Sequence, residues 1–194
     1  MKTTKLLLAM MAGAGLTLAG AAQSATMTKE QRDAAYKDAS AQYTADKERC
    51  KSMSGNAKDV CMQEARGKEK VAKAEADAGY KNTPKAREDA RMARADADYG
   101  VAKEKCDDLS GNPKDVCVKE AKAAYTKAKA DAKVDRVAAD TRETSSEKMA
   151  SARKDAAEDK RDANYKVAIE KCDSLSGAAK DTCVKDAKAR YGKS

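Results

Sequence analysis

The sequence predicts an all-α protein of three antiparallel helical hairpins, each with one disulfide near its turn, in an elongated or loosely bundled arrangement. Three observations support this fold class. Alanine and charged residues, most of them good helix formers, dominate a chain that contains no Phe, Trp or His. A segment with two cysteines occurs three times. Between its cysteines, each copy carries residues typical of a tight turn that joins two helices.

The first segment, 1–25, has the features of a secretory signal peptide. Lys2 and Lys5 give a positively charged start, residues 6–18 are uncharged and rich in Leu, Met, Ala and Gly, and small residues follow. We expect cleavage between Ala22 and Ala25, and a periplasmic or secreted bacterial protein. A retained membrane anchor is the alternative, although the second half of this segment is weakly hydrophobic for a membrane span.

The repeated segment reads RCKSMSGNAKDVCMQEA from Arg49, KCDDLSGNPKDVCVKEA from Lys105 and KCDSLSGAAKDTCVKDA from Lys171. The cysteines of each copy are separated by ten residues, and the copies start 56 and 66 residues apart. Such a regular repeat implies one supersecondary unit per copy. We therefore assign one hairpin to each of the ranges 26–82, 83–140 and 141–194.

The turn of each hairpin is marked by a glycine. Gly55 and Gly111 suit a left-handed helix end, and Asn56 and Asn112 after them suit the cap of the following helix. The third copy keeps Gly177 but has alanine at the next position, so we expect its second helix to start less sharply. A helix, a short turn and a second helix make an antiparallel αα-hairpin.

The junctions between hairpins carry their own signals. The sequence Lys81-Asn82-Thr83-Pro84 predicts the end of the first hairpin and the start of the second. The sequence Thr144-Ser145-Ser146-Glu147 indicates a capping box that opens the third.

Six cysteines allow 15 pairings, but export, the even number and the repeated local spacing favour one bridge within each copy. The predicted pairs are Cys50–Cys61, Cys106–Cys117 and Cys172–Cys183. A structural zinc site would need ligands two to four residues apart and often histidine, so we expect no metal. A thiol redox site would favour a CxxC motif, which is also absent.

Helical spacing places small and aromatic residues face to face along the seam of each hairpin, which is the line of contact between its two helices. The predicted opposite pairs are Tyr99 with Tyr125, Ala102 with Ala121, Tyr165 with Tyr191 and Ala168 with Ala187. Small residues beside the bridge are needed because a disulfide requires Cα atoms within about 7 Å, closer than the usual 8–10 Å between packed helices. In the first copy, Asp46 takes the alanine position and Glu69 stands opposite Tyr43. We therefore expect the first hairpin to be the loosest.

The composition argues against several classes of function. Removal of Lys2 and Lys5 lowers the net charge from +8 to +6, and acids and bases alternate along the chain, which is typical of a solvated helix surface and not of a nucleic-acid-binding protein. No paired carboxylates, nucleophile motif or phosphate loop stands out, and the commonest general base, histidine, is missing. We expect no catalytic activity and no cofactor, and we interpret the tyrosines as seam residues.

Alanine- and lysine-rich stretches such as 121–134, together with the repeated cysteine pairs, resemble uncharacterised secreted proteobacterial proteins of similar composition. The stretches are also similar in composition to the long periplasmic helix of the envelope protein TolA and to late-embryogenesis-abundant proteins. These resemblances imply exposed, extended helices and carry over no functional residue.

The sequence thus leads to two functional hypotheses. The first is a non-catalytic periplasmic or secreted helical structural or interaction protein of the cell envelope. Its partners would be envelope proteins, peptidoglycan or anionic lipid, and its leftover apolar faces could support self-association. The alternative is an envelope stress protectant that binds anionic lipid surfaces or damaged proteins through alanine-rich amphipathic helices and an excess of lysine.

Overall fold

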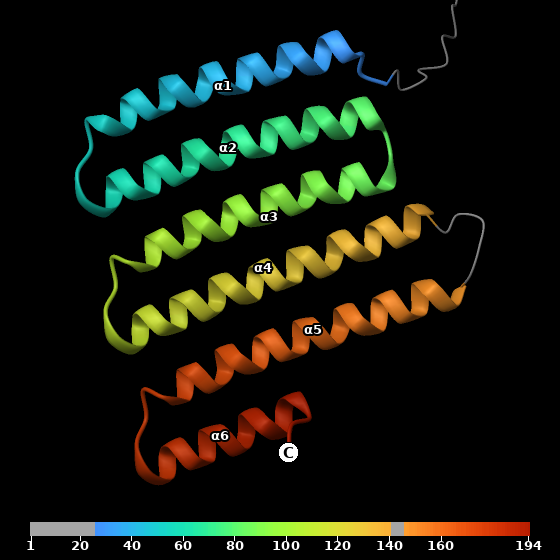
Figure 1. The fold of residues 1–194 in the computed structure, drawn as a ribbon. Helices are drawn as coiled ribbons and strands as arrows, with labels where there is room; N and C mark the ends of the chain where they lie inside the picture. Colours follow the sequence, from blue (N-terminus) through green and yellow to red (C-terminus); the bar gives the residue numbers. More distant parts are fainter. Residues whose placement is uncertain (1–25, 141–145) are drawn as a thin grey trace, which may run out of the picture.

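The computed structural model describes residues 26–140 and 146–194. This part of the chain forms six α-helices and no strand, which confirms the predicted all-α class (Figure 1). The helices are α1 (Lys29–Lys51), α2 (Gly55–Lys81), α3 (Pro84–Cys106), α4 (Gly111–Asp140), α5 (Ser146–Cys172) and α6 (Gly177–Tyr191). The predicted signal peptide with its cleavage site, the alternative membrane anchor and the first half of the predicted 144–147 capping box lie outside the described residues.

The predicted junction between the first two hairpins is confirmed. Helix α2 ends at Lys81, and Asn82 after it adopts the left-handed conformation with φ of 47°. Thr83 caps α3, because its hydroxyl oxygen accepts a hydrogen bond from the N–H of Ala86 at 3.1 Å. Pro84 occupies the first helical position, where its missing N–H costs nothing.

The glycines at the hairpin turns have the left-handed conformation that the sequence predicted, but each one begins the second helix of its hairpin and does not end the first. Gly55, Gly111 and Gly177 have φ angles of 56°, 59° and 56°, a region that favours glycine over other residues. The chain therefore reverses at the same position in each copy, and all three turns lie at one end of the molecule (Figure 1).

The predicted capping role of Asn56 and Asn112 is wrong. The cap of α2 is Ser54 and the cap of α6 is Ser176, both extended and without a side-chain hydrogen bond to the helix. Because α2 and α4 begin at Gly55 and Gly111, Asn56 and Asn112 lie inside their helices, and α6 begins at Gly177 in the same way. The expected weaker start of the third copy is therefore wrong as well. The side-chain amides of the two asparagines bind elsewhere, as described below.

One disulfide closes each hairpin beside its turn. The bonds are Cys50–Cys61, Cys106–Cys117 and Cys172–Cys183, with Cα–Cα distances of 5.6, 5.7 and 5.7 Å. Ala65, Ala121 and Ala187, one helical turn beyond the second cysteine of each pair, are buried. Small side chains at these positions let the two backbones approach closely enough for the bridge, as the sequence predicted.

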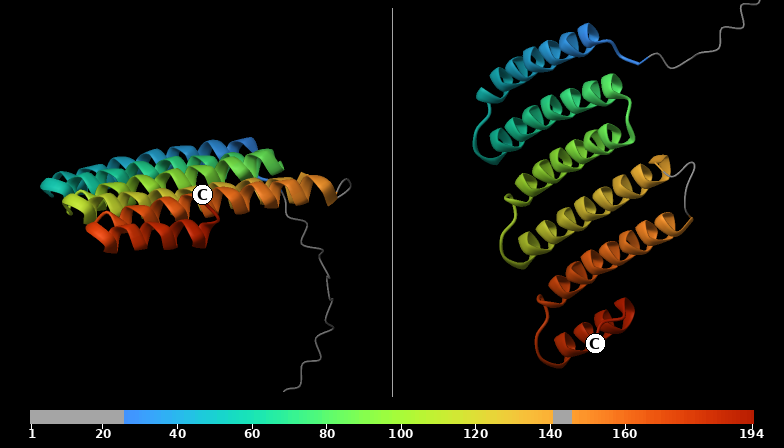
Figure 2. Two further views of the ribbon diagram at one scale, coloured as in Figure 1. Left: turned by 90° about the horizontal axis from the view of Figure 1, so that it is seen from below. Right: turned by 45° about the vertical axis from the view of Figure 1, so that its right-hand side comes forward.

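The hairpins do not form separate units but continue into one another side by side. Across the described residues, each helix packs only against the helices that precede and follow it in the chain. The result is a single antiparallel layer with α1 at one edge and α6 at the other (Figures 1 and 2). Both broad faces of this layer remain open, because the described residues form no second layer that covers them.

The buried residues form thin lines between helices and no central core. Apart from Gly67 and Asp46, every buried side chain in the described ranges belongs to alanine or to the first cysteine of a disulfide. Each buried CH₂ group stabilises a fold by about 0.8 kcal/mol, so a seam of methyl groups gives little stabilisation. The covalent bridges offset part of this deficit.

Candidate functional site

The predicted aromatic pairs meet inside the second and third hairpins. Tyr99 and Tyr125 stack with ring centroids 5.1 Å apart, and Tyr165 and Tyr191 make an edge contact at 6.2 Å. The hydroxyl of Tyr125 donates a hydrogen bond to Asp96 at 2.7 Å. That bond and partial burial raise the pKa of Tyr125. These tyrosines therefore pack in the seam, and the hydroxyl of Tyr125 is bound at its rim.

The first hairpin buries a carboxylate where the others place alanine. Asp46 is 3% exposed and lies in a polar network: Gln42 and Arg49 contact its Oδ1 at 2.7 and 2.6 Å, and Lys68 approaches Oδ2 at 3.7 Å. The disulfide beside it has the same Cα–Cα distance as the others within 0.1 Å. The ion pairs and the hydrogen bond satisfy the buried charge, and the looseness of this hairpin stays a prediction.

Glu69 stands at the position of the second seam tyrosine, opposite Tyr43, as the sequence indicated, and it is bound by one residue of its own helix and by one of α1. It accepts hydrogen bonds from Lys73 at 2.6 Å and from Ser40 at 3.0 Å. The bond from Lys73 is the main reason that the pKa of Glu69 lies below its usual value.

Farther along the first hairpin, the structure shows an aromatic cluster that sequence reasoning missed. The guanidinium of Arg32 lies 4.7 Å from the ring centroid of Tyr80 and 5.9 Å from that of Tyr36. Cation–π contacts of this kind stabilise exposed sites by about 0.5–1 kcal/mol. The two tyrosines lie outside the repeated segments, so the repeat comparison gave no signal for them.

Contacts between neighbouring hairpins use equivalent positions at both junctions. Asn56 donates to the backbone carbonyl of Glu104 at 2.9 Å, and Asn112 donates to that of Glu170 at 2.9 Å. Each asparagine therefore joins its own turn to the end of the first helix of the next hairpin. In the described part of the chain, no hairpin follows the last copy, and there the position is occupied by Ala178.

Ion pairs repeat across the same two junctions. Glu64 of α2 pairs with Lys105 of α3 at 3.7 Å, and Glu120 of α4 pairs with Lys171 of α5 at 2.6 Å. The repeated cysteine segment thus encodes two surfaces, one for the seam within a hairpin and one for the junction to the next. Sequence reasoning found only the first, although the loss of asparagine in the last copy was the available signal.

The junction between α2 and α3 is close because it lacks a side chain. A Cβ atom at Gly67 would lie 2.8 Å from the Cβ of Ala97, nearer than such atoms normally approach. Ala123 occupies the position of Gly67 at the junction of α4 with α5. Glycine is therefore required only at the first junction.

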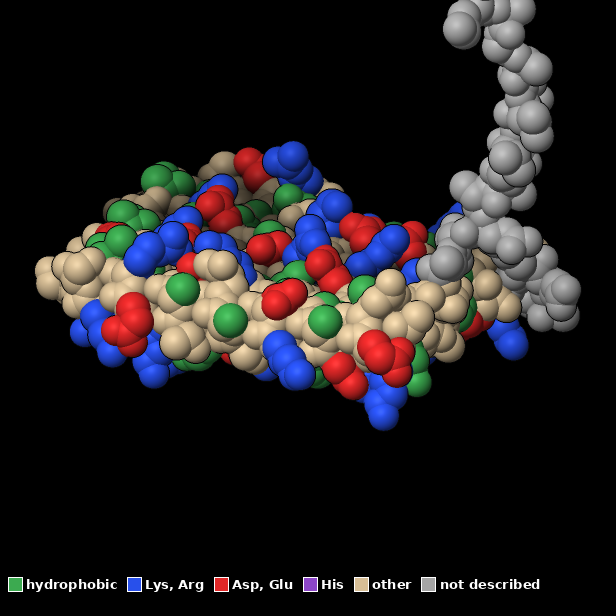
Figure 3. All heavy atoms as spheres, turned by 90° about the horizontal axis from the view of Figure 1, so that it is seen from above, with side chains coloured by type: hydrophobic (Ala, Val, Ile, Leu, Met, Phe, Trp, Pro, Cys, Tyr) green, Lys and Arg blue, Asp and Glu red, His purple; other side chains and the backbone are tan. Residues whose placement is uncertain are grey.

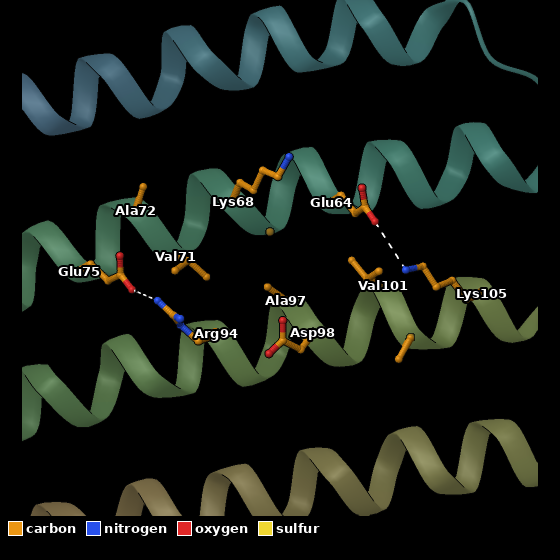
Figure 4. A pocket seen from close by; sticks show the side chains of 12 residues that line it. Glu64, Lys68, Val71, Ala72, Glu75, Arg94, Ala97, Asp98, Val101 and Lys105 are labelled. Atoms are coloured by element: carbon orange, nitrogen blue, oxygen red, sulfur yellow. Dashed lines mark hydrogen bonds and ion pairs between the residues drawn. The ribbon is translucent and has the colours of Figure 1, made fainter.

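A shallow groove of about 610 Å³ runs along this first junction (Figure 4). Val71, Ala97 and Val101 give it an apolar lining, and an ion pair lies toward each end, Glu64 with Lys105 and Glu75 with Arg94. The groove combines an apolar strip with fixed charges of both signs, an arrangement that suits contact with an extended or helical segment of another molecule.

The second junction has a smaller counterpart. A groove of about 370 Å³ between α4 and α5 is lined by Ala123, Lys127, Lys160 and Val167 among others. Lys127 stands at the position that Val71 occupies in the first groove, so the second groove has a lysine where the first has an apolar side chain. The two grooves share their geometry but not their chemistry.

The turn end of the array exposes one large apolar side chain per copy. Met53, Leu109 and Leu175 occupy the same position of the repeat and are 45%, 44% and 43% exposed. Elsewhere, charged side chains of both signs are interleaved over the visible surface (Figure 3). Within the described ranges, no three His, Cys, Asp or Glu side chains converge in a way that could hold a metal ion.

The three disulfides are typical of a protein that works in an oxidising, extracytoplasmic compartment. Of the helices in the described part, none is both long and apolar enough to cross a membrane. Comparisons of the chain with known protein families, with curated proteins and with solved structures found no match.

Proposed function

We propose that this protein is a non-catalytic helical structural or interaction protein of the bacterial cell envelope, periplasmic or secreted after loss of a signal peptide. The observation that carries the proposal is the single helical layer, in which both broad faces are open. A chain that spreads into one layer exposes far more surface than a globular domain of the same length. Such a plate is suited to contacts with other molecules.

The charged groups at the junctions support a binding role over a catalytic one. Hydrogen bonds from Lys70 to Asp96 and from Lys160 to Asp131 hold the pKa values of both carboxyls below their usual range. Carboxyls of this kind stay ionised at neutral pH, whereas a general acid needs a raised pKa. These groups are therefore suited to fixing charges at a surface and not to moving protons.

The groove between α2 and α3 is the contact site that the structure favours. Its apolar strip around Val71 and Val101 is bordered by paired charges, and it is larger than the groove at the second junction. A partner with an apolar strip and flanking charges would displace water from the valines and leave the ion pairs intact.

The test is capture of envelope components by the mature protein with its disulfides intact. We compare wild type with Val101→Lys and with Val167→Lys, which makes the same change at the equivalent position of the smaller groove. The proposal expects retention of an envelope protein or of peptidoglycan that Val101→Lys abolishes and Val167→Lys preserves. If wild type retains neither, or if both variants retain the partner equally, the proposed site is wrong.

The excess of positive charge, +8 for the whole chain and +6 without Lys2 and Lys5, favours a second candidate: a protectant that binds anionic lipid or damaged proteins. Co-sedimentation with vesicles that contain phosphatidylglycerol, in low and in high salt, tests the lipid form. Binding at low salt that disappears at high salt would support it. A protein that stays in the supernatant at low salt would eliminate it.

A further inference from the structure

The junction of α4 with α5 shows how two hairpins recognise one another. Lys119 of α4 pairs with Glu170 of α5 at 3.1 Å, and the adjacent Glu120 pairs with Lys171 at 2.6 Å. Basic and acidic side chains therefore alternate on each helix and match in opposite order across the junction. This double pair fixes which residue of one helix lies beside which residue of the other.

Helix α6 carries the same pattern at the free edge of the array. Lys185 and Asp186 occupy the repeat positions of Lys119 and Glu120, and both are exposed. Among the described residues no helix follows α6, so its outer flank has the charge pattern of a junction with no hairpin beside it.

Helix α1 carries the complementary pattern at the opposite edge. Glu48 and Arg49 occupy the repeat positions of Glu170 and Lys171, and both are exposed. Both are paired along their own helix, Glu48 with Lys51 at 2.7 Å and Arg49 with Asp46 at 2.6 Å, and their side chains remain 60% and 69% exposed. The outer flank of α1 therefore matches the outer flank of α6 in charge.

Some side chains on the two edge helices are also small enough to let the helices approach one another. Ala41 of α1 and Ala189 of α6 stand at the positions of Ala97 and Gly67, which make the close contact between α2 and α3, and both alanines are exposed. Seen from the α1 side, a band of backbone, uncharged polar side chains and small hydrophobic side chains runs along the molecule, with acidic side chains on it in places (Figure 3). Such a band allows another helix to lie close.

We propose that the edges bind one another between copies, so that α6 of one molecule packs beside α1 of the next, with Lys185 opposite Glu48 and Asp186 opposite Arg49. The contact is heterologous, so it continues the array from copy to copy in a head-to-tail manner. Ala178 cannot provide the hydrogen bond that Asn56 and Asn112 make at the internal junctions. Assembly is therefore weaker than the internal junctions, reversible and dependent on concentration and salt.

This inference uses the two edge helices, whereas the proposed function uses the groove between α2 and α3. Failure of one leaves the other standing.

The test is analytical ultracentrifugation of the mature, oxidised protein over a wide range of concentration in low and high salt. The proposal expects assembly that grows with concentration and weakens with salt. The single charge reversals Glu48→Lys and Lys185→Glu should each weaken assembly by about tenfold, because an attraction becomes a repulsion. Lys122→Glu makes the same charge change as Lys185→Glu at an exposed position of α4, which is not an edge helix, and should assemble as wild type does.

The decisive measurement is a mixture of Glu48→Lys with Lys185→Glu. Each variant alone places two like charges at the contact, so its copies repel one another. In the mixture, the lysine introduced at position 48 faces the glutamate introduced at position 185 at one contact, and the native Lys185 faces the native Glu48 at the other, so assembly should return. A mixture that assembles no better than its components would overturn the proposal.

Carbodiimide coupling adds an independent readout, because it should join Lys185 to Glu48 in wild type. Those residues lie at opposite edges of one molecule, so the bond can form only between copies (Figure 1). A protein that stays monomeric at low salt would also overturn the proposal.

Discussion

At the scale of single residues, the fold depends on positions where a side chain is small or absent. The seams are lined by alanine, and Gly67 is buried against Ala97 at the junction of α2 with α3. In a protein without a thick core, such contacts decide how near the helices come. One added methyl group at a junction therefore has a larger effect than the same change on an open face.

We expect Gly67→Ala to destabilise the protein by about 1–2 kcal/mol, because overpacking outweighs the gain of about 1 kcal/mol in helix propensity. Thermal unfolding followed by circular dichroism measures this. Gly79→Ala is the matched control: a Cβ there would lie 3.5 Å from the nearest atoms of Met27, an ordinary contact, so this variant should be as stable as wild type or more so. Ala97→Gly in the Gly67→Ala background should restore the lost stability. If it does not, the close contact is not the cause.

A second residue-scale prediction concerns Asn112, which joins the second hairpin to the third. Asn112→Ala should lower the free energy of unfolding by about 1 kcal/mol, the usual net value of one hydrogen bond, since the carbonyl of Glu170 loses its donor. Denaturant unfolding provides the measurement. Ala178→Asn, the reverse change at the edge of the array, should leave the stability of the monomer unchanged. Equal effects of the two changes would contradict a junction role for the asparagine.

At the scale of helices and hairpins, each disulfide compensates for a thin apolar seam. Closing a loop of this length stabilises a hairpin by about 2–3 kcal/mol in the chain-entropy account. The bridge lies beside the turn, so it holds the two helices in register where the backbones are nearest. The remaining length of each hairpin depends on alanine contacts and, in the second and third, on a tyrosine pair.

Reduction of the disulfides should therefore remove a large part of the helix signal in circular dichroism at ambient temperature. Non-reducing peptide mapping should recover three local pairs from the exported protein. The double substitution of Cys106 and Cys117 by serine should have a larger effect than that of Cys172 and Cys183, because the second hairpin has neighbours on both sides and the third lies at an edge. Free thiols in the exported protein, or helix content unchanged after reduction, would contradict this account.

Ion pairs between helices predict how stability changes with pH. A hydrogen bond from Lys70 is the main reason that the pKa of Asp96 lies below its usual value, and one from Tyr125 adds to it. The stabilising contribution is complete above the unfolded pKa of about 3.9 and disappears as the pH falls through the lower folded value. From about pH 5 down to about pH 2, the melting temperature of wild type should fall more steeply than that of Asp96→Asn.

Asp98→Asn removes the same charge from an exposed position of the same helix and serves as the control. It should show the acid-induced loss of wild type. Parallel pH profiles for wild type and Asp96→Asn would contradict the stabilising role of the Asp96 contacts.

At the scale of the whole molecule, the single layer predicts an unusual size. Helices about 40 Å long, side by side at about 9 Å, form a plate whose radius of gyration is about 19 Å. A globular domain of the same length would have a value of about 15–16 Å. Small-angle X-ray scattering of the mature protein at low concentration and high salt measures this directly. A value near that of a globular domain would mean that the layer folds back on itself in solution.

The sequence by itself determined the local structure of this protein. Helix composition, the glycine at each turn and the spacing of the cysteines fixed the hairpins, because each bridge joins residues only 11 positions apart. Helical spacing also placed Tyr99 opposite Tyr125 correctly. Such contacts follow from the sequence because a short turn fixes which faces of the two helices meet and at what height.

Only the tertiary structure decided how the hairpins lie relative to one another. The contact of Asn56 with Glu104 joins residues 48 positions apart on the neighbouring helices α2 and α3, and apart from its cysteine the buried residues of α3 are all alanine. With methyl groups on either side, the hydrophobic pattern does not specify which flank meets the next hairpin or whether a second layer forms. The arrangement depends on three features: the hydrogen bonds from the asparagine side chains to backbone carbonyls, the ion pairs between hairpins, and the space beside Gly67. Each of them involves atoms that come together only when the hairpins pack.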